Sequence, residues 1–155
     1  MTLDGATVLK GYSELSETDK AYIAALIDGE GCILIQKTRP NGAECSPKYT
    51  LCVTVGITYE PTIRYLHNVF GGTYASKRIR VPGWKPQWVW RVSGARAVEC
   101  LEVVYPYLKE KREQAWLGLE YSKQLTLTKT MKLGVPPEEL ALREGYYLAL
   151  QWAKT

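Results

Sequence analysis

Two pairs of short segments alternate apolar and polar side chains, and this pattern restricts the possible fold more than any other feature of the chain. Residues 32–38 and 49–58 form the first pair, and residues 74–81 and 87–93 form the second. Successive side chains of a strand point to opposite faces, so each segment is expected to bury one face and expose the other. Turn residues separate the members of each pair, which predicts two antiparallel hairpins.

Helical signals precede, separate and follow these hairpins. The helices are expected from the capping box at residues 16–19 to the glycines at 29–31, over residues 60–70, 95–104 and 106–125, and from residue 136 onward. The order predicts an α+β fold, with an antiparallel four-stranded sheet and helices on one face. We expect an N-terminal extension (1–15), a core domain (16–125) and a C-terminal helical extension of the same domain (126–155).

Composition excludes several classes of protein. A chain of 155 residues has the usual size of one domain. It contains no apolar run long enough for a transmembrane helix and no apparent signal peptide, so we expect no membrane association. The four cysteines form no C-x-x-C pair, which disfavours a zinc site and favours reduced intracellular thiols. The expected location is therefore intracellular. Composition does not distinguish an organelle (chloroplast or mitochondrion) from a prokaryotic cytoplasm.

Charge is segregated along the chain. No Asp or Glu occurs between Pro61 and Val98, although the net charge is only +4. The same stretch contains seven basic residues: Arg64, Lys77, Arg78, Arg80, Lys85, Arg91 and Arg96. A cationic surface on a sheet indicates a polyanionic partner, and a double-stranded DNA groove suits such a surface. The alternative is a solvated basic face without a partner.

The end of the first helix departs from the usual charge pattern. Asp28 and Glu30 lie where a helix dipole favours cations, so another group must offset their charge. A divalent cation bound by carboxylate oxygen would do so. Ala24 and Ala25 would let this helix approach a second helix closely, although an ordinary buried helix has the same pattern. Two copies of the chain would then bring both Glu30 carboxylates together, as a site for metal-dependent phosphodiester hydrolysis requires.

These residues carry a resemblance to a known family. Ile23 to Gly31 resembles the LAGLIDADG motif of homing endonucleases, and Cys32 to Ile35 resembles the strand that follows it. Pro106 to Ala115 resembles the start of the family's basic helix. The single copy of the motif resembles the homodimeric type, which has the αββαββα fold. The resemblance thus implies a homodimer that cleaves both strands of a long pseudo-palindromic DNA target during intron homing.

The resemblance also implies roles for individual residues. Glu30 matches the catalytic metal-binding acid, and the carbonyl of Gly29 matches a further metal ligand. Asp28 matches an acid with a structural role, and Lys111 matches a lysine near the scissile phosphates. The polar catalytic residue after the second strand falls at Thr58 or at the following tyrosine. The implied metal is Mg²⁺, with Mn²⁺ as a substitute and Ca²⁺ as a non-catalytic occupant.

The remaining expectations concern surfaces. The dimer interface is expected at Ala24, Ala25 and Ile27. Strand alternation and neighbouring cations give the expected DNA-binding residues, which are Gln36, Thr38, Arg39, Lys48, Thr50, Thr54, Ser76, Lys77, Arg78, Arg80, Lys85, Gln87, Arg91, Lys109 and Arg112. Two other functions fit the same scaffold, namely an intron RNA maturase and a DNA-binding protein that does not cleave.

Overall fold

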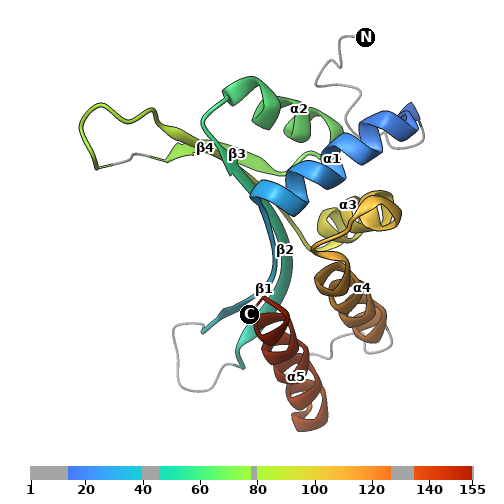
Figure 1. Ribbon diagram of the computed structural model, residues 1–155. Coiled ribbons are helices and arrows are strands. Elements are labelled where there is room, and N and C mark those ends of the chain that lie inside the picture. Colours follow the sequence, from blue (N-terminus) through green and yellow to red (C-terminus); the bar gives the residue numbers. More distant parts are fainter. Residues whose placement is uncertain (1–13, 40–45, 78–79, 127–134, 155) are drawn as a thin grey trace.

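The computed structural model describes residues 14–39, 46–77, 80–126 and 135–154, in which helices cover one face of a four-stranded antiparallel sheet (Figure 1). The strands lie in the order β1-β2-β4-β3. The elements follow the chain as α1 (Glu17–Glu30), β1 (Gly31–Thr38), β2 (Lys48–Ile57), α2 (Glu60–Phe70), β3 (Thr73–Lys77), β4 (Gln87–Ser93), α3 (Ala95–Val104), a 3-10 turn (Tyr105–Tyr107), α4 (Arg112–Thr126) and α5 (Pro137–Ala153). The predicted fold class is confirmed.

Helix α1 begins as the sequence predicts. The Ser16 side chain accepts a hydrogen bond from the Asp19 backbone N–H at 3.1 Å, which satisfies one of the free donors of the first turn. Ile23, Ala24 and Ile27 face the core and are fully buried. Their spacing places them on one side of the helix, so α1 packs this side on the sheet and leaves the opposite side in solvent.

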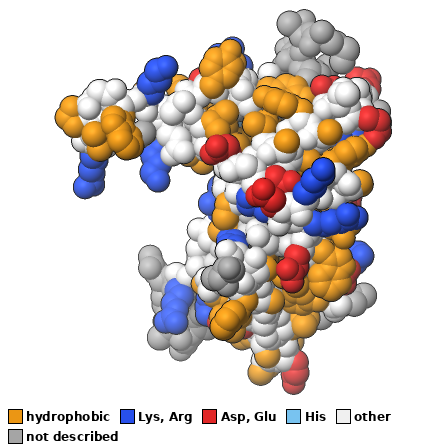
Figure 2. Space-filling view, viewed as in Figure 1, with side chains coloured by type: hydrophobic (Ala, Val, Ile, Leu, Met, Phe, Trp, Pro, Cys, Tyr) orange, Lys and Arg blue, Asp and Glu red, His pale blue; other side chains and the backbone are white. Residues whose placement is uncertain are grey.

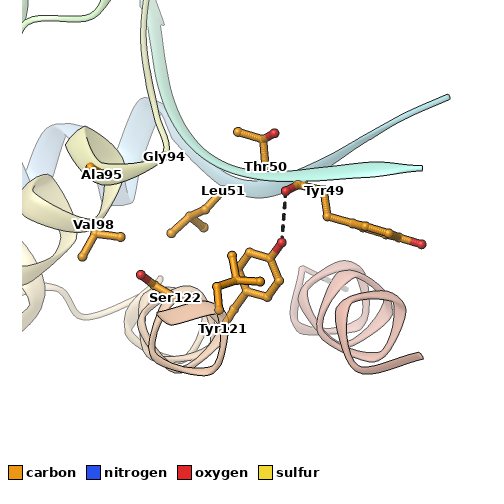
Figure 3. A pocket seen from close by; sticks show the side chains of 9 residues that line it. Tyr49, Thr50, Leu51, Gly94, Ala95, Val98, Tyr121 and Ser122 are labelled. Carbon is orange, nitrogen blue, oxygen red and sulfur yellow. Dashed lines mark hydrogen bonds between the residues drawn. The ribbon is translucent and has the colours of Figure 1, made fainter. Parts of the chain in front are cut away.

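The alternating strands sort their side chains between two faces. Leu51, Val53 and Val55 of β2 point into the core beneath the helices. Thr50 points away from the helices, as Figure 3 shows beside Leu51 and Tyr121. We call the helix-covered side the inner face and the opposite side the outer face. Among the described residues, no helix lies across the outer face (Figure 1), although the residue after α5, Lys154, reaches its β1 edge and donates to the Cys32 sulfur at 3.3 Å.

Two predicted boundaries are wrong. Strand β3 is Thr73–Lys77 and does not include Val81, to which it was expected to extend. Ser76 pairs with Trp88 and so shares its inner face. Lys77 pairs with Gln87 and occupies the outer face, so the predicted alternation of this strand is shifted by one residue. Helix α4 begins at Arg112 rather than at Pro106, because the intervening turn is held by a contact with α1 described below.

Helix α5 packs against α4 and against the edge strand β1. The Lys37 ammonium donates to the Glu144 carboxylate at 2.8 Å, and the Tyr49 hydroxyl donates to the same oxygen. These bonds hold the middle of α5 to the first hairpin. Among the described residues, no helix combines the length and apolar character needed to span a membrane.

The outer face is concave because the two hairpins extend to the same side of the molecule (Figure 1). Figure 2 shows a notch between the two hairpins, with Lys and Arg side chains along the upper one. Lys77, Arg80 and Lys85 are exposed in this hairpin and its connection. The hollow side of the sheet is therefore the cationic side.

Candidate functional site

The end of α1 lies against the beginning of α4 and beside the start of β1. The chain passes from helix to strand without a loop, and the Gly31 N–H donates to the Ile27 carbonyl. A Cβ atom at Gly31 would lie 2.7 Å from both the Cα and the carbonyl oxygen of Ile27, which is closer than real Cβ contacts. Only glycine permits this tight junction, which fixes the direction of the acids that precede it.

Asp28 caps helix α4 from a distant part of the sequence. Its carboxylate accepts hydrogen bonds from the backbone N–H groups of Lys109, at 2.9 Å, and Lys111, at 3.0 Å. The first N–H groups of a helix and the residues before it lack intrahelical partners and carry partial positive charge. Asp28 is thus unfavourably placed on its own helix and favourably placed for α4.

Lys111 supplies the cation that α1 lacks. The last turn of α1 contains no basic residue. The Lys111 ammonium instead donates to the backbone carbonyl of Asp28, across a separation of 83 residues. A cation at a helix C-terminus offsets the negative end of the dipole. The protein itself therefore offsets the charge around Asp28, which agrees with the structural role expected for this acid.

Glu30 differs from Asp28 in having no such partner. Its side chain is exposed, and none of the described residues forms a hydrogen bond or ion pair with it. The Gly29 carbonyl is also without a partner among them, as is usual for the last carbonyls of a helix. Carboxylate and carbonyl oxygens are ligands that Mg²⁺ and Ca²⁺ prefer, so this donor set fits such an ion. The described residues contain no group of three or more His, Cys, Asp or Glu side chains able to hold a metal, so one chain offers only a partial site.

Other predicted site residues lie nearby. Gly31 pairs with Val55, so the end of β2 and the exposed Thr58 that follows it lie beside the end of α1. Lys109 is exposed at the junction of α1 and α4. Arg112 is exposed at the start of α4, with its guanidinium 5.0 Å from the centre of the Tyr105 ring.

The outer face of the sheet continues directly from this end of α1. The four described strands contain no Asp or Glu. Eight of the predicted DNA-binding residues share the outer face, as the register shows: Gln36, Thr38, Lys48, Thr50, Thr54, Lys77, Gln87 and Arg91. Arg39, Arg80 and Lys85 lie in exposed connections. Ser76 is on the inner face, and Arg78 lies outside the described residues.

The expected dimer interface needs correction. Ala24 and Ile27 are fully buried in the chain's own core, so neither can face a second copy. Ala25 is exposed, and so are Ala21 and Gly29, which were not predicted from the sequence. Their four-residue spacing was the available signal, because it places all three on one side of a helix. No described atom lies within 4 Å of the position that a Cβ atom would take at Gly29, so this side has room for close approach.

One cavity of about 280 Å³ lies away from this site. It is lined by residues of β2, α3 and α4, and the lining is mostly apolar. The Tyr121 hydroxyl donates to the Tyr49 carbonyl at 3.0 Å at its edge (Figure 3). Because Leu51 and Val98 fill the side toward the core, this cavity belongs to the packing of α4 on the sheet.

Solved structures of homing endonucleases share the fold of this chain. I-CvuI, in complex with its target in the presence of Ca, matches with a TM-score of 0.70 and 24% identity, over 88% of this chain and 82% of that chain. The archaeal intron-encoded I-Vdi141I, complexed with DNA, matches with a TM-score of 0.69 and 13% identity, over 88% and 84%. The LAGLIDADG enzyme I-SmaMI, bound to cleaved DNA, matches with a TM-score of 0.68 and 12% identity, over 88% and 45%.

These similarities define the class of fold. No protein-family model matches the sequence, and no curated protein matches it. The structural matches are nevertheless extensive and consistent in topology. The chain has the LAGLIDADG homing endonuclease fold, as the sequence predicted.

Proposed function

We propose that this protein is a site-specific DNA endonuclease that binds double-stranded DNA on the outer face. It acts as a homodimer, and Glu30 is the catalytic residue of each active site. The observation that supports this function most directly is the division of labour between the two acids of α1. Asp28 is bonded to the start of α4, whereas Glu30 is exposed and unpartnered among the described residues. A carboxylate that is left available at the end of a tightly joined helix and strand suits a ligand or reactive role.

The position of Glu30 relative to the cationic surface supports a phosphate substrate. The acid-free strands begin at the residue after Glu30, and Lys111 lies at the same helix end. Duplex DNA on the outer face would therefore place its backbone near both groups. The neighbouring proteins of the same fold are DNA complexes, which agrees with this partner.

Magnesium is the proposed metal, with the Glu30 carboxylate and the Gly29 carbonyl as its protein ligands. When bound, a divalent ion of this kind activates water and stabilises the leaving oxygen of a phosphodiester. The Lys111 ammonium is held at the Asp28 carbonyl, and from this position it would contact the negatively charged phosphate. Asp28 acts through this arrangement and positions Lys111, since it bonds that residue's backbone N–H.

The partial metal site supports a homodimer. One described chain contributes a single acid at this point, and two copies would contribute two. Ala21, Ala25 and Gly29 form an exposed stripe of small residues along α1 that ends next to Glu30. Close packing of two α1 helices along this stripe would bring both Glu30 residues to the symmetry axis. The chain matches 45% of the length of I-SmaMI, which agrees with two copies of this fold acting together.

Cleavage of a randomised duplex library in Mg²⁺, followed by sequencing of the ends, tests the function without a known target. We expect Glu30→Gln to retain DNA binding by gel shift and to lose cleavage. Glu102→Gln changes an exposed glutamate on α3 in the same way and should cleave like the wild type. Cleavage at the wild-type rate by Glu30→Gln would contradict the catalytic assignment. Failure of the wild type to bind any duplex would contradict the DNA-binding proposal itself.

A further inference from the structure

Three side chains of the outer face form one cluster that spans three strands. The Nη2 atom of Arg91, on β4, donates to the side-chain amide oxygen Oε1 of Gln36, on β1. The same atom donates to the Cys52 sulfur on β2 at 2.8 Å. Arg91 pairs with Thr54, so its side chain runs diagonally over β2 to reach Gln36. We call these three residues the Arg91 cluster.

The bonds within the Arg91 cluster determine what it can offer to a ligand. A guanidinium has only donors, so Gln36 must turn its carbonyl oxygen toward Arg91 and its amide nitrogen away. Neither that amide nitrogen nor Nε and Nη1 of Arg91 has a partner among the described residues. The free groups of the cluster are therefore all N–H donors.

A surface made only of donors distinguishes between bases. Glutamine recognises adenine with its oxygen as acceptor and its nitrogen as donor, and the Gln36 oxygen is already occupied. Guanine presents two acceptors, O6 and N7, at its major-groove edge. Adenine presents one acceptor and one donor there, and its donor would face the donors of Arg91. The cluster thus matches guanine and opposes adenine.

The charge of Arg91 is not neutralised within the cluster. Gln36 is neutral, and burial raises the pKa of the Cys52 thiol, which keeps it protonated. The Cys52 thiol donates in turn to the Thr50 carbonyl at 3.5 Å. An arginine with neutral partners keeps the positive charge that strengthens hydrogen bonds to an acceptor edge.

The position of the cluster favours a base over a phosphate. Strands β2 and β4 are the two central strands of the sheet. The Arg91 side chain starts on β4 and passes over β2. Side chains at the middle of a sheet that lies in the major groove are nearest the base edges, whereas those at its rim are nearest the backbone. We infer that Arg91 is a specificity-determining residue that reads a guanine in each half of the DNA target, and that Gln36 and Cys52 position it. This inference rests on the DNA-binding function proposed above.

Selection from a randomised duplex library with the full-length protein tests this inference. The variants are Arg91→Met, which keeps an unbranched apolar stem and removes every donor, and Gln36→Met, which replaces the amide by an apolar group of similar size. Arg64→Met is the control, since Arg64 is exposed on α2 and paired with Glu60. Base preference at each position and the salt dependence of binding are measured for each protein, after circular dichroism has shown that it is folded.

The expected result is a guanine position in the wild-type profile whose preference falls by about 10-fold or more in Arg91→Met. Gln36→Met should weaken the same preference partly, and Arg64→Met should leave the profile unchanged. If Arg91→Met does not fold, Gln36→Met still tests the inference, because this variant keeps Arg91. Loss of a base preference is a result that a purely structural role of Gln36 would not produce.

Other outcomes would overturn the inference. Arg91→Met could weaken binding equally for all sequences and lower the salt dependence, which would make Arg91 a phosphate contact. Both variants could instead select the same sequences as the wild type. This result would show that neither Arg91 nor Gln36 determines the base preference. In both cases the wild type still selects DNA, so the proposed function stands. A wild type that enriches no duplex contradicts the proposed function and the inference together.

Discussion

Asp28 and Glu30 lie two residues apart on one helix, yet their removal should affect stability very differently. Asp28→Ala deletes two charge-assisted hydrogen bonds to backbone N–H groups, at 2.9 and 3.0 Å, and leaves both donors without this acceptor. Hydrogen bonds to charged groups contribute about 1.5–3 kcal/mol each, and partial exposure reduces the sum. We expect Asp28→Ala to lower the free energy of unfolding by about 2–3 kcal/mol.

Glu30→Ala should change the free energy of unfolding by less than about 0.5 kcal/mol, because its side chain is exposed and forms no hydrogen bond or ion pair with the described residues. Asp19→Ala is the matched aspartate control. Asp19 lies in the first turn of α1, where an exposed acid contributes only about 0.3–1 kcal/mol through the helix dipole.

Urea unfolding followed by circular dichroism measures all three variants. With a slope of about 2 kcal/mol/M, Asp28→Ala should lower the midpoint by roughly 1 M. The thermal midpoint should fall by about 5–10 °C for a chain of this size. An Asp28→Ala midpoint equal to that of Glu30→Ala would refute the cap on α4, and with it the separation of roles between the two acids.

Three further predictions concern the dimer, the core and the first hairpin. Ala25→Glu should give a monomer by light scattering with an unchanged circular dichroism spectrum, because Ala25 is exposed in one chain, and a persistent dimer would exclude the α1 interface. Tyr121→Phe should lower the free energy of unfolding by about 1–2 kcal/mol in urea, because the Tyr49 carbonyl loses its 3.0 Å donor; an unchanged value would show that water replaces it. The hydrogen bond from Lys37 holds the pKa of Glu144 below its ordinary 4.5. The ionised Glu144 carboxylate therefore contributes its full stabilisation above pH 4.5, and this stabilisation is lost as the pH falls through the lowered pKa. Glu144→Gln should therefore show a shallower loss of stability below pH 4.5, and acid titrations that coincide would contradict this ion pair.

Local patterns were sufficient for most elements. The period of two along β2 separates Leu51 and Val53 from Thr50 and Thr54, and this separation depends only on strand geometry. Helix α3 lies over the expected residues, since its flanking glycine and proline restrict it locally. The predicted alternation of β3 was wrong by one residue, because its side chains give little contrast between an apolar and a polar face. Pairing with β4 decides which of its side chains face outward.

The residues expected at a dimer interface show where local pattern was insufficient. The sequence shows small residues on α1, and both sides of the helix contain them. Ala24 faces the core and Ala25 faces solvent, and this difference depends on where the sheet lies against the helix. The same holds for Cys52, whose contact with Arg91 joins strands that are distant in sequence. Pairwise contacts of this kind leave no periodic signal.

The sequence by itself determined the element order, the two-faced sheet, the cationic surface and the unusual acids at the end of α1, because each depends on neighbouring residues or on composition. Only the tertiary structure decided what each acid contacts. Asp28 is bonded by backbone groups 81 and 83 residues away, and Lys111 reaches the same helix end. Folding brings the negative end of α1 against the positive start of α4, so the charge of Asp28 is offset within the protein while Glu30 is left exposed. The physical reason is electrostatic, and it depends on the relative position of two helices that no local pattern records.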